Sequence, residues 1–178
     1  MTGFLNVYKA EGVSSAFVVN RIKYLAHRPC GHLGTLDPLA CGVLPVGVGN
    51  ATRLFDYFLG KEKEYLARFR FGKTTPTLDR EGEAGGEGRV PSEEELCAAL
   101  PRFVGEIDQV PPLYSAKSVS GRRGYELARA GEQFTLPPKR VTVRQFSLLE
   151  RCAPDEFSFR IVCGGGTYIR SLARDLAA

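Results

Sequence analysis

Two segments of the sequence alternate between apolar and polar residues with the period of a β-strand. They are EYLARFRFG at residues 64–72 and EFSFRIVC at residues 156–163. Successive side chains of a strand point to opposite faces, so each segment gathers its apolar residues on one face. Strands packed on one face only are typical of an antiparallel sheet. The two apolar sets are Tyr65, Ala67, Phe69 and Phe71, and Phe157, Phe159, Ile161 and Cys163.

Other strands and helices follow in mixed order along the chain. A capping box from Ser92 to Glu95 predicts the start of one helix. Helical spacing predicts another, with Val18, Ile22 and Leu25 on its packed face. Strands outnumber helices, so we predict an α+β fold with a mixed, largely antiparallel sheet and flanking helices. The remaining expected elements are strands at residues 4–10 and 139–150, a helix beginning at Ser14 or Ser15 and ending near residue 27, and a helix after the glycines at 164–166.

The length of 178 residues is typical of one domain, so we expect residues 1–178 to form a single domain. The sequence stops two alanines into the last expected helix, without a C-cap. We therefore expect this domain to be truncated at its C-terminus. Residues 79–90, rich in acids and glycine, are expected to form a loose loop.

Composition excludes several classes of protein. No stretch approaches the roughly 20 apolar residues of a membrane span, and the start MTGFLNVYK does not resemble a signal peptide. The five cysteines are odd in number and form no C-x-x-C pair, which favours free, buried thiols in the cytoplasm over disulfides or zinc. We expect a cytoplasmic monomer without a bound metal.

Charge is unevenly distributed, although the net charge is only +4. Residues 79–95 carry seven acids and two arginines, whereas residues 117–151 carry eight basic residues and three acids. The basic run lies close to Tyr114 and includes Tyr125. Cations and aromatic rings together suit contacts with RNA phosphates and bases, but a solvated face is the ordinary explanation of such a run.

Asp37 is the only acid in the segment GHLGTLDPLACGVLPVGVGNATR, residues 31–53. The following Pro38 biases Asp37 away from helical backbone. An Asp in a turn is one interpretation; a carboxylate used in chemistry is the other, because carboxylates are rarely placed in apolar surroundings without a partner. Around it, we expect the chain to be buried at Leu39, Val43, Leu44, Val46 and Val48. Tyr65 and Arg170 are two further candidates for chemistry.

Five segments together resemble the TruB family of tRNA pseudouridine synthases, which isomerise the T-loop uridine of tRNA. Five such motifs in the same order are far more specific than any one alone. The resemblance extends over essentially the whole chain. The segments are GFLNVYKAEGVSSAFVVNRIK, GHLGTLDPLACGVLPVGVGNATRL, KEYLARFRFGKTTPTLDREGE, QVPPLYSAKSVSGRRGYELAR and GGGTYIRSLARDL.

This resemblance implies a pseudouridine-synthase fold and an isomerase that flips its target base out of the stack. It implies that Asp37 is the nucleophile, that Tyr65 stacks on the uracil and assists proton transfer, and that Arg170 pairs with Asp37. The expected partner is the T stem-loop of tRNA, without a cofactor. Residues implied or expected to contact RNA are His32, Tyr114, Arg122, Arg123 and Tyr168.

Some features depart from the family pattern. Leu33 replaces a small hydroxyl residue, and Ser118 stands where a lysine is usual, with Lys117 one position earlier. The family's catalytic domain continues past the position of Ala178, and many members add a PUA domain. A non-catalytic RNA-binding or tRNA-folding module is therefore the alternative. A phosphoryl-transfer enzyme is disfavoured because no second acid for Mg²⁺ lies between Glu11 and Asp56 apart from Asp37.

Overall fold

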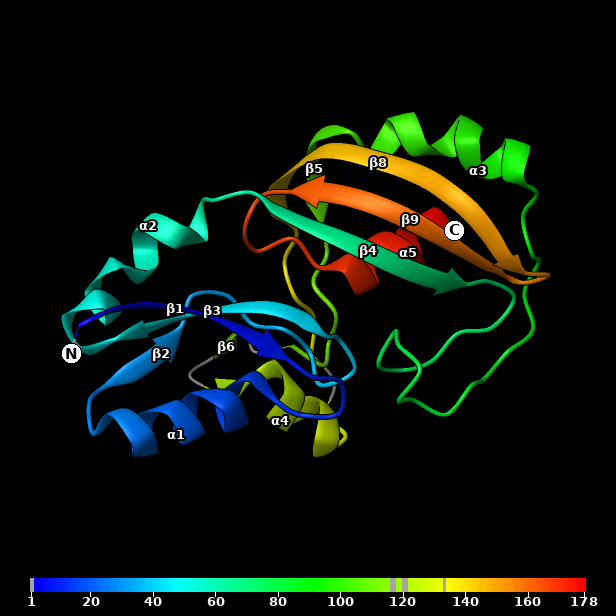
Figure 1. Ribbon diagram of the computed structural model, residues 1–178. Coiled ribbons are helices and arrows are strands. Elements are labelled where there is room, and N and C mark those ends of the chain that lie inside the picture. The colour runs from blue at the N-terminus through cyan, green and yellow to red at the C-terminus, as the bar shows by residue number, and fades with distance from the viewer. Residues whose placement is uncertain (1, 116–117, 120–121, 133) are drawn as a thin grey trace. The chain divides into compact units, whose positions relative to one another are not determined.

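The computed structural model describes residues 2–115, 118–119, 122–132 and 134–178 (Figure 1). For residues 59, 118, 119, 122, 123, 125, 126 and 129 it describes only the backbone. The chain divides into two compact units, Met1–Lys61 and Glu62–Ala178. The single domain expected from the sequence stays a prediction.

Unit 1 is built on a three-stranded antiparallel sheet in the order β1-β3-β2. In this sheet Tyr8 lies opposite Val43, and His32 lies opposite Val46. The elements are β1 (Gly3–Lys9), α1 (Ser15–Ala26), β2 (Cys30–His32), β3 (Gly42–Val48), the 3₁₀ helix η1 (Gly49–Leu54) and α2 (Phe55–Leu59).

Strand β3 forms the centre of unit 1, since Leu44, Val46 and Val48 are fully buried. Val43 alternates with them and is 60% exposed, so its expected burial was wrong. The reason is the strand period, which turns every second side chain outward. Gly47 is needed here because a Cβ would lie 3.2 Å from backbone atoms of the following 3₁₀ helix.

Helix α1 begins as predicted. The side chain of Ser14 accepts a hydrogen bond from the Phe17 amide, and the helix ends at His27 in the left-handed conformation. Val18 and Ile22 are partly buried, but Leu25 is 68% exposed. The prediction that Leu25 lies on the packed face was therefore wrong.

Unit 2 is built on a four-stranded antiparallel sheet in the order β4-β9-β8-β5, with a separate β6–β7 pair. Its strands are β4 (Lys63–Arg70), β5 (Gly105–Gln109), β6 (Ser118–Val119), β7 (Arg122–Arg123), β8 (Lys139–Ala153) and β9 (Glu156–Cys163). Its helices are α3 (Glu93–Ala99), the 3₁₀ helix η2 (Leu100–Phe103), α4 (Gly124–Arg129) and α5 (Ile169–Leu176). The capping box of Ser92 and Glu95 is confirmed at the start of α3.

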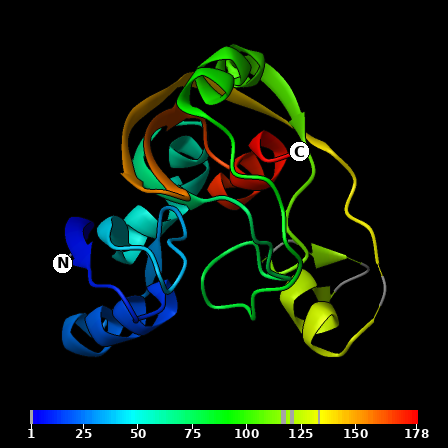
Figure 2. The same ribbon diagram turned by 90° about the vertical axis from the view of Figure 1, so that its right-hand side faces the viewer.

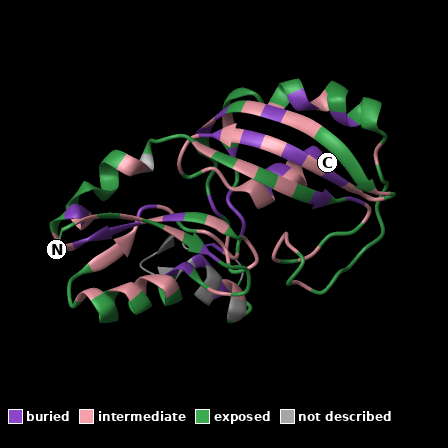
Figure 3. Ribbon diagram, in the orientation of Figure 1, coloured by how far each residue is buried: buried purple, intermediate pink, exposed green. Residues whose placement is uncertain are grey.

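The predicted alternation is confirmed in β4 and β9. Phe157, Phe159, Ile161 and Cys163 are all fully buried on one face of the sheet, and Figure 3 shows the alternating burial along β9. Helices α3 and α5 both contribute to the core on this face, which curves around α5 in Figure 2. The core residues from these helices and η2 are Leu96, Leu100, Leu172 and Leu176.

The opposite face of the sheet is covered by ion pairs. Arg160 donates two hydrogen bonds to Glu64 across the strands, at 2.6 and 2.9 Å. Arg70 likewise donates to Asp155 at 2.7 Å. The arginines on the exposed face of β4 and β9 are thus neutralised within the sheet.

The cysteines depart in part from expectation. All five are free thiols. Only Cys163 is buried, and burial raises the pKa of its thiol. Cys41, Cys97 and Cys152 are exposed, so the expectation of buried thiols was wrong for these three.

We expect Leu172→Ala to lower the free energy of unfolding by about 2–5 kcal/mol, because it leaves a cavity where Leu172 is now fully buried. The measurement is urea unfolding followed by circular dichroism. Leu66→Ala is the matched control, since Leu66 is 77% exposed and its loss should change stability by less than about 0.5 kcal/mol. Equal effects of the two changes would contradict the assigned core.

Candidate functional site

The loop that carries Asp37 is fixed on both sides of this residue. On one side, the buried Ser15 hydroxyl donates to the Leu36 carbonyl at 2.8 Å and accepts from the Leu36 amide at 3.0 Å. On the other side, the Pro38 carbonyl accepts from the Gly12 amide at 2.9 Å. The Asp37 carbonyl closes the turn by accepting from the Ala40 amide at 3.0 Å. The backbone at Asp37 is therefore held in place by groups of unit 1.

Lys9 supplies another anchor for this loop. Its side chain is fully buried, and its ammonium donates to the carbonyls of Pro38 at 3.2 Å, Ala10 at 3.0 Å and Val13 at 2.7 Å. Three carbonyl acceptors match the three N–H donors of the ammonium. Burying a cation is costly unless its donors are satisfied, so Lys9 ties the end of β1 and the start of α1 to the Asp37 loop.

His32 lies at the end of β2, five residues before Asp37. Its side chain is partly buried, and its Nδ1 is buried without a hydrogen-bond partner among the described residues. Burial lowers the pKa of His32, because desolvation disfavours the charged imidazolium. His32 is thus held in the neutral form at pH 7, with one ring nitrogen unsatisfied in unit 1.

In unit 2, Arg170 occupies the first turn of α5, where the helix dipole disfavours a cation. Only 14% of its side chain is exposed. Its guanidinium donates to the carbonyls of Thr77 at 2.8 Å and Tyr114 at 3.1 Å, and lies 3.4 Å from the carboxylate of Asp79. These acceptors offset the dipole and fix the direction of the guanidinium.

Asp79 is presented to Arg170 by an ordered turn. Its carboxylate accepts from the Thr77 hydroxyl at 2.6 Å and from the Glu81 amide at 3.0 Å. The Thr75 hydroxyl bonds to both the amide and the carbonyl of Asp79. The start of the acidic segment is therefore not the loose loop that was expected, and its first acid belongs to the surroundings of Arg170.

The start of α5 is attached to the end of β5 and to the residue that follows it. The side-chain amide of Gln109, 1% exposed, donates to the Tyr168 carbonyl at 3.1 Å and accepts from the Tyr168 amide at 2.8 Å. The next carbonyl, that of Val110, accepts from the Ser171 hydroxyl and from Arg174. Arg170 thus lies between residues anchored on both sides.

The other residues predicted for chemistry or RNA contact lie in unit 2. Tyr65 is on the core side of β4, partly buried and packed against the hydrophobic cluster. Tyr114 contributes its carbonyl to Arg170, and Tyr168 is the N-cap residue of α5. Arg122 and Arg123 form β7, but their side chains are not among those described, and Lys117 lies outside the described residues.

Asp37 and His32 belong to unit 1, whereas Tyr65 and Arg170 belong to unit 2. The pairing of Arg170 with Asp37 therefore stays a prediction. Sequence reasoning missed Lys9, Ser15, Asp79 and Gln109. Their residue types gave no signal, because each acts through a hydrogen bond or ion pair whose partner is distant in sequence or set by the fold.

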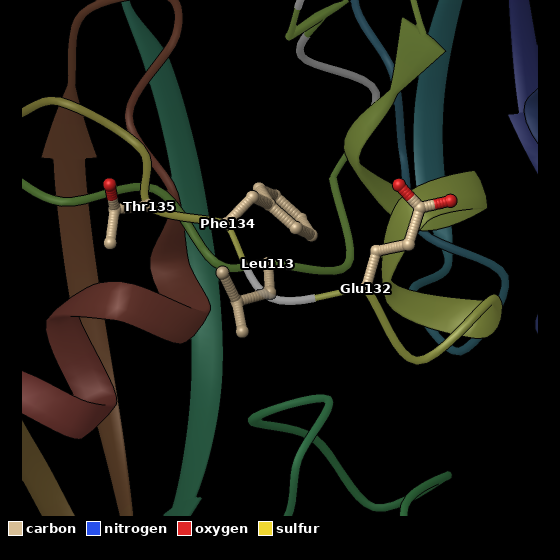
Figure 4. A pocket seen from close by; sticks show the side chains of 4 residues that line it. All are labelled: Leu113, Glu132, Phe134 and Thr135. Carbon is tan, nitrogen blue, oxygen red and sulfur yellow. The ribbon is translucent and has the colours of Figure 1, made fainter.

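A hollow of about 550 Å³ in unit 2 is lined by Leu113, Glu132, Phe134 and Thr135. Figure 4 shows Leu113 and Phe134 close together, with the carboxylate of Glu132 pointing away from them. None of the predicted catalytic residues lines it. Among the described residues, no three His, Cys, Asp or Glu side chains cluster as metal ligands would. No helix among them is long and apolar enough to cross a bilayer.

Curated proteins similar to this chain are named tRNA pseudouridine synthase B. The protein of Nostoc sp. is 46% identical, over 100% of this chain and 62% of the relative. That of Rhodospirillum rubrum is 45% identical, over 98% of this chain and 58% of the relative. That of Bartonella henselae is 42% identical, over 99% and 56%. The chain thus spans less than two-thirds of the length of these relatives.

Solved structures with a similar fold cover 98% of this chain. One is the crystal structure of a Cbf5–Nop10–Gar1 complex, with a TM-score of 0.71 and 31% identity over 43% of that chain. Another is an H/ACA RNP bound to a substrate RNA containing 2′-deoxyuridine, with a TM-score of 0.67 and 27% identity over 42% of that chain.

A family model described as TruB family pseudouridylate synthase, N-terminal domain, matches residues 22–169. This match assigns the chain to the class of pseudouridylate synthases. The matched residues include Asp37 and Tyr65. Within this class the chain belongs to the TruB family, so the resemblance found in the sequence is confirmed.

We expect Ser15→Ala to loosen the Asp37 loop, because it removes both hydrogen bonds to the Leu36 backbone. The free energy of unfolding should fall by about 1–3 kcal/mol, as is typical when buried polar groups lose their partner. The Leu36 amide should exchange its hydrogen faster. Ser14→Ala is the matched control: it costs about 1 kcal/mol through the helix cap but should leave Leu36 exchange unchanged. Equal Leu36 protection in all three proteins would show that Ser15 does not anchor the loop.

Protonation of His32 should destabilise the fold. Its pKa is lowered in the folded state, so below its ordinary value of 6.5 the unfolded state binds the proton first. The free energy of unfolding is then highest above about pH 6.5 and falls as the pH drops below it. His32→Gln should make this fall shallower between pH 7 and pH 5, measured by urea unfolding. His27→Asn, at an exposed position whose left-handed backbone suits Asn, should keep the parent's slope. If the free energy of unfolding of His32→Gln fell with pH as steeply as that of the parent, the lowered pKa of His32 would be contradicted.

Proposed function

We propose that this chain is the catalytic part of a tRNA pseudouridine synthase that isomerises uridine 55 in the T-loop of tRNA. The observation that carries the proposal is the anchoring of Asp37. A lone carboxylate in a surface turn needs no fixed backbone, yet buried Ser15 and Lys9 hold the residues on either side of it. Preorganised geometry of this kind is what a nucleophile requires.

In the proposed reaction the bond between the ribose anomeric carbon and N1 of uracil breaks, the base turns, and a bond forms from the same carbon to carbon 5. The proton on carbon 5 is lost and N1 gains one, so the reaction needs neither a redox change nor water. The Asp37 carboxylate begins it by attacking carbon 6 or the anomeric carbon, or by removing a ribose proton. The base must first leave the stack, at a cost of a few kcal/mol.

Tyr65 is proposed to stack on the flipped uracil and to assist proton transfer from carbon 5. Its position on β4, packed against the core, supports a rigid aromatic platform. Arg170 is proposed to hold Asp37 in its ionised form. A guanidinium fixed by two carbonyls and Asp79 cannot reorient freely, which suits electrostatic stabilisation of developing charge.

His32, Tyr114, Tyr168, Arg122 and Arg123 are proposed to contact the T stem-loop. For His32 the support is its place in the motif that resembles the family, since its Nδ1 is buried and has no partner among the described residues. The names of the curated relatives support tRNA as the RNA bound.

We expect Asp37→Asn to reduce pseudouridine formation by more than 100-fold while the affinity for tRNA changes less than threefold, because the amide keeps the shape but cannot act as nucleophile or base. The measurement is tritium release from tRNA labelled at carbon 5 of uridine, with filter binding in parallel. Asp56→Asn, at an exposed aspartate of the same unit, is the matched control and should release tritium like the parent. Turnover by the Asp37→Asn variant within tenfold of the parent would refute the assignment. A parent chain that binds tRNA without releasing tritium would favour the binding module instead.

A further inference from the structure

Most of the net positive charge of the chain lies in its smaller unit. Unit 1, residues 1–61, carries six basic and three acidic residues, whereas unit 2 carries eighteen basic and seventeen acidic residues. No acid occurs between Glu11 and Asp37, although Arg21, Lys23 and Arg28 lie there. This cationic segment is helix α1 and the residues that follow it.

In the basic run at residues 117–151, by contrast, the arginines whose side chains are described bond to groups of unit 2. Arg140 pairs with Asp108 at 2.9 Å, and Arg144 pairs with Glu62. Arg151 donates to the carbonyls of Ala153 and Pro154. These three arginines bond to protein groups on or near β8, so they are poor candidates for phosphate contacts.

Helix α1 has one packed face and one exposed face. Ser15 is buried and Val18 and Ile22 are partly buried. On the opposite side, Phe17, Arg21 and Tyr24 follow one another at i, i+4 and i+7, which places them on one helix face. Phe17 is 60% exposed and Tyr24 is 68% exposed. The exposed stretches of α1 are visible in Figure 3.

The α1 face, as the name is used below, consists of Phe17, Arg21 and Tyr24, together with Lys23 on an adjoining side of the helix and Arg28 in the segment after it. All five are exposed. Among the described residues, none of its three cations forms an ion pair, unlike the arginines of the β4-β9-β8 sheet. The surface therefore offers cations without an acidic partner in the described part of the chain, beside two exposed rings.

The chemistry of this face fits a nucleic acid backbone. Arg21 lies on α1 and Arg28 in the segment that follows the helix, so these two cations offer two separate contact points to the phosphates of one strand. Arginine binds phosphate oxygens in a fork geometry, and exposed aromatic rings stack on bases. An anionic polymer complements a face that has three cations and no acid.

We propose that the α1 face binds the sugar-phosphate backbone of the substrate RNA, with Arg21, Lys23 and Arg28 on phosphates and Phe17 and Tyr24 against bases or sugars. This inference rests on the proposed function for the identity of the RNA. It adds a binding surface in unit 1, separate in sequence from the basic run of unit 2.

The test is the salt dependence of tRNA binding by the double variant Arg21→Ala/Arg28→Ala. Losing two phosphate contacts should lower the slope of log affinity against log salt by between about one and two, and should weaken binding at low salt by at least about tenfold. Arg68→Ala/Arg144→Ala is the matched control, because both arginines are exposed but paired with acids. The control should keep the parent's slope.

A second variant, Phe17→Ala/Tyr24→Ala, separates the rings from the charges. It should weaken tRNA binding by about 5-fold or more with an unchanged slope, since stacking releases no counterions. Urea unfolding midpoints like the parent's would show that these surface changes leave the fold intact.

Tritium release at saturating tRNA distinguishes this inference from the proposed function. Variants of the α1 face should reach the parent's maximal rate once saturated. If the parent shows no turnover, the proposed function is overturned. The slope of log tRNA affinity against log salt would still test whether the α1 face binds RNA. An unchanged slope in Arg21→Ala/Arg28→Ala would overturn the inference. If Arg21→Ala/Arg28→Ala lost the parent's binding to anionic phosphatidylserine vesicles while it bound tRNA like the parent, the inference would also be overturned. The α1 face would then be assigned to a membrane surface.

Discussion

Strand β9 is the element on which unit 2 depends. It lies between β4 and β8, and its residues Phe157, Phe159, Ile161 and Cys163 have no exposed surface. Helices α3 and α5 pack on the same side of it. Because α5 carries Arg170 and β4 carries Tyr65, both candidate residues of unit 2 take their positions from packing against this strand.

Buried polar side chains then fix the backbone near the candidate site residues. Ser15 and Lys9 do this for the Asp37 loop, and Gln109 does it for the start of α5. In each case the side chain bonds to main-chain groups, which in loops lack the partners that a helix or sheet provides. These hydrogen bonds thereby fix the backbone of the segments that carry the candidate residues.

The two units differ in whether their exposed cations are paired with carboxylates. On the exposed face of the unit 2 sheet, cations such as Arg160 and Arg70 are paired with carboxylates and hold neighbouring strands or turns. Such exposed pairs contribute little to stability, typically below about 1 kcal/mol each. In unit 1 the cations of α1 have no such pairs within the part of the chain that the structure describes. Pairing, rather than the number of basic residues, indicates which surface is available to an anionic partner.

The sequence by itself determined the local features of the fold. The alternation at residues 64–72 and 156–163 predicted two strands and their buried faces, because a strand has a period of two whatever surrounds it. The capping residues Ser14, Ser92 and Glu95 predicted helix starts, because a cap acts within three residues. The five motifs in their order predicted the family, since motif order is a property of the sequence alone.

Only the tertiary structure decided which residues meet. It turned Val43 and Leu25 outward, exposed three cysteines, buried Lys9 and placed Asp79 beside Arg170. These outcomes depend on contacts between distant segments: Arg170 and Asp79 are separated by ninety-one positions, and no local propensity encodes such a pair. Ion pairing, and the burial of residues outside a clear alternation, are set by what the chain folds against, which is why these could not be predicted from residue type and spacing.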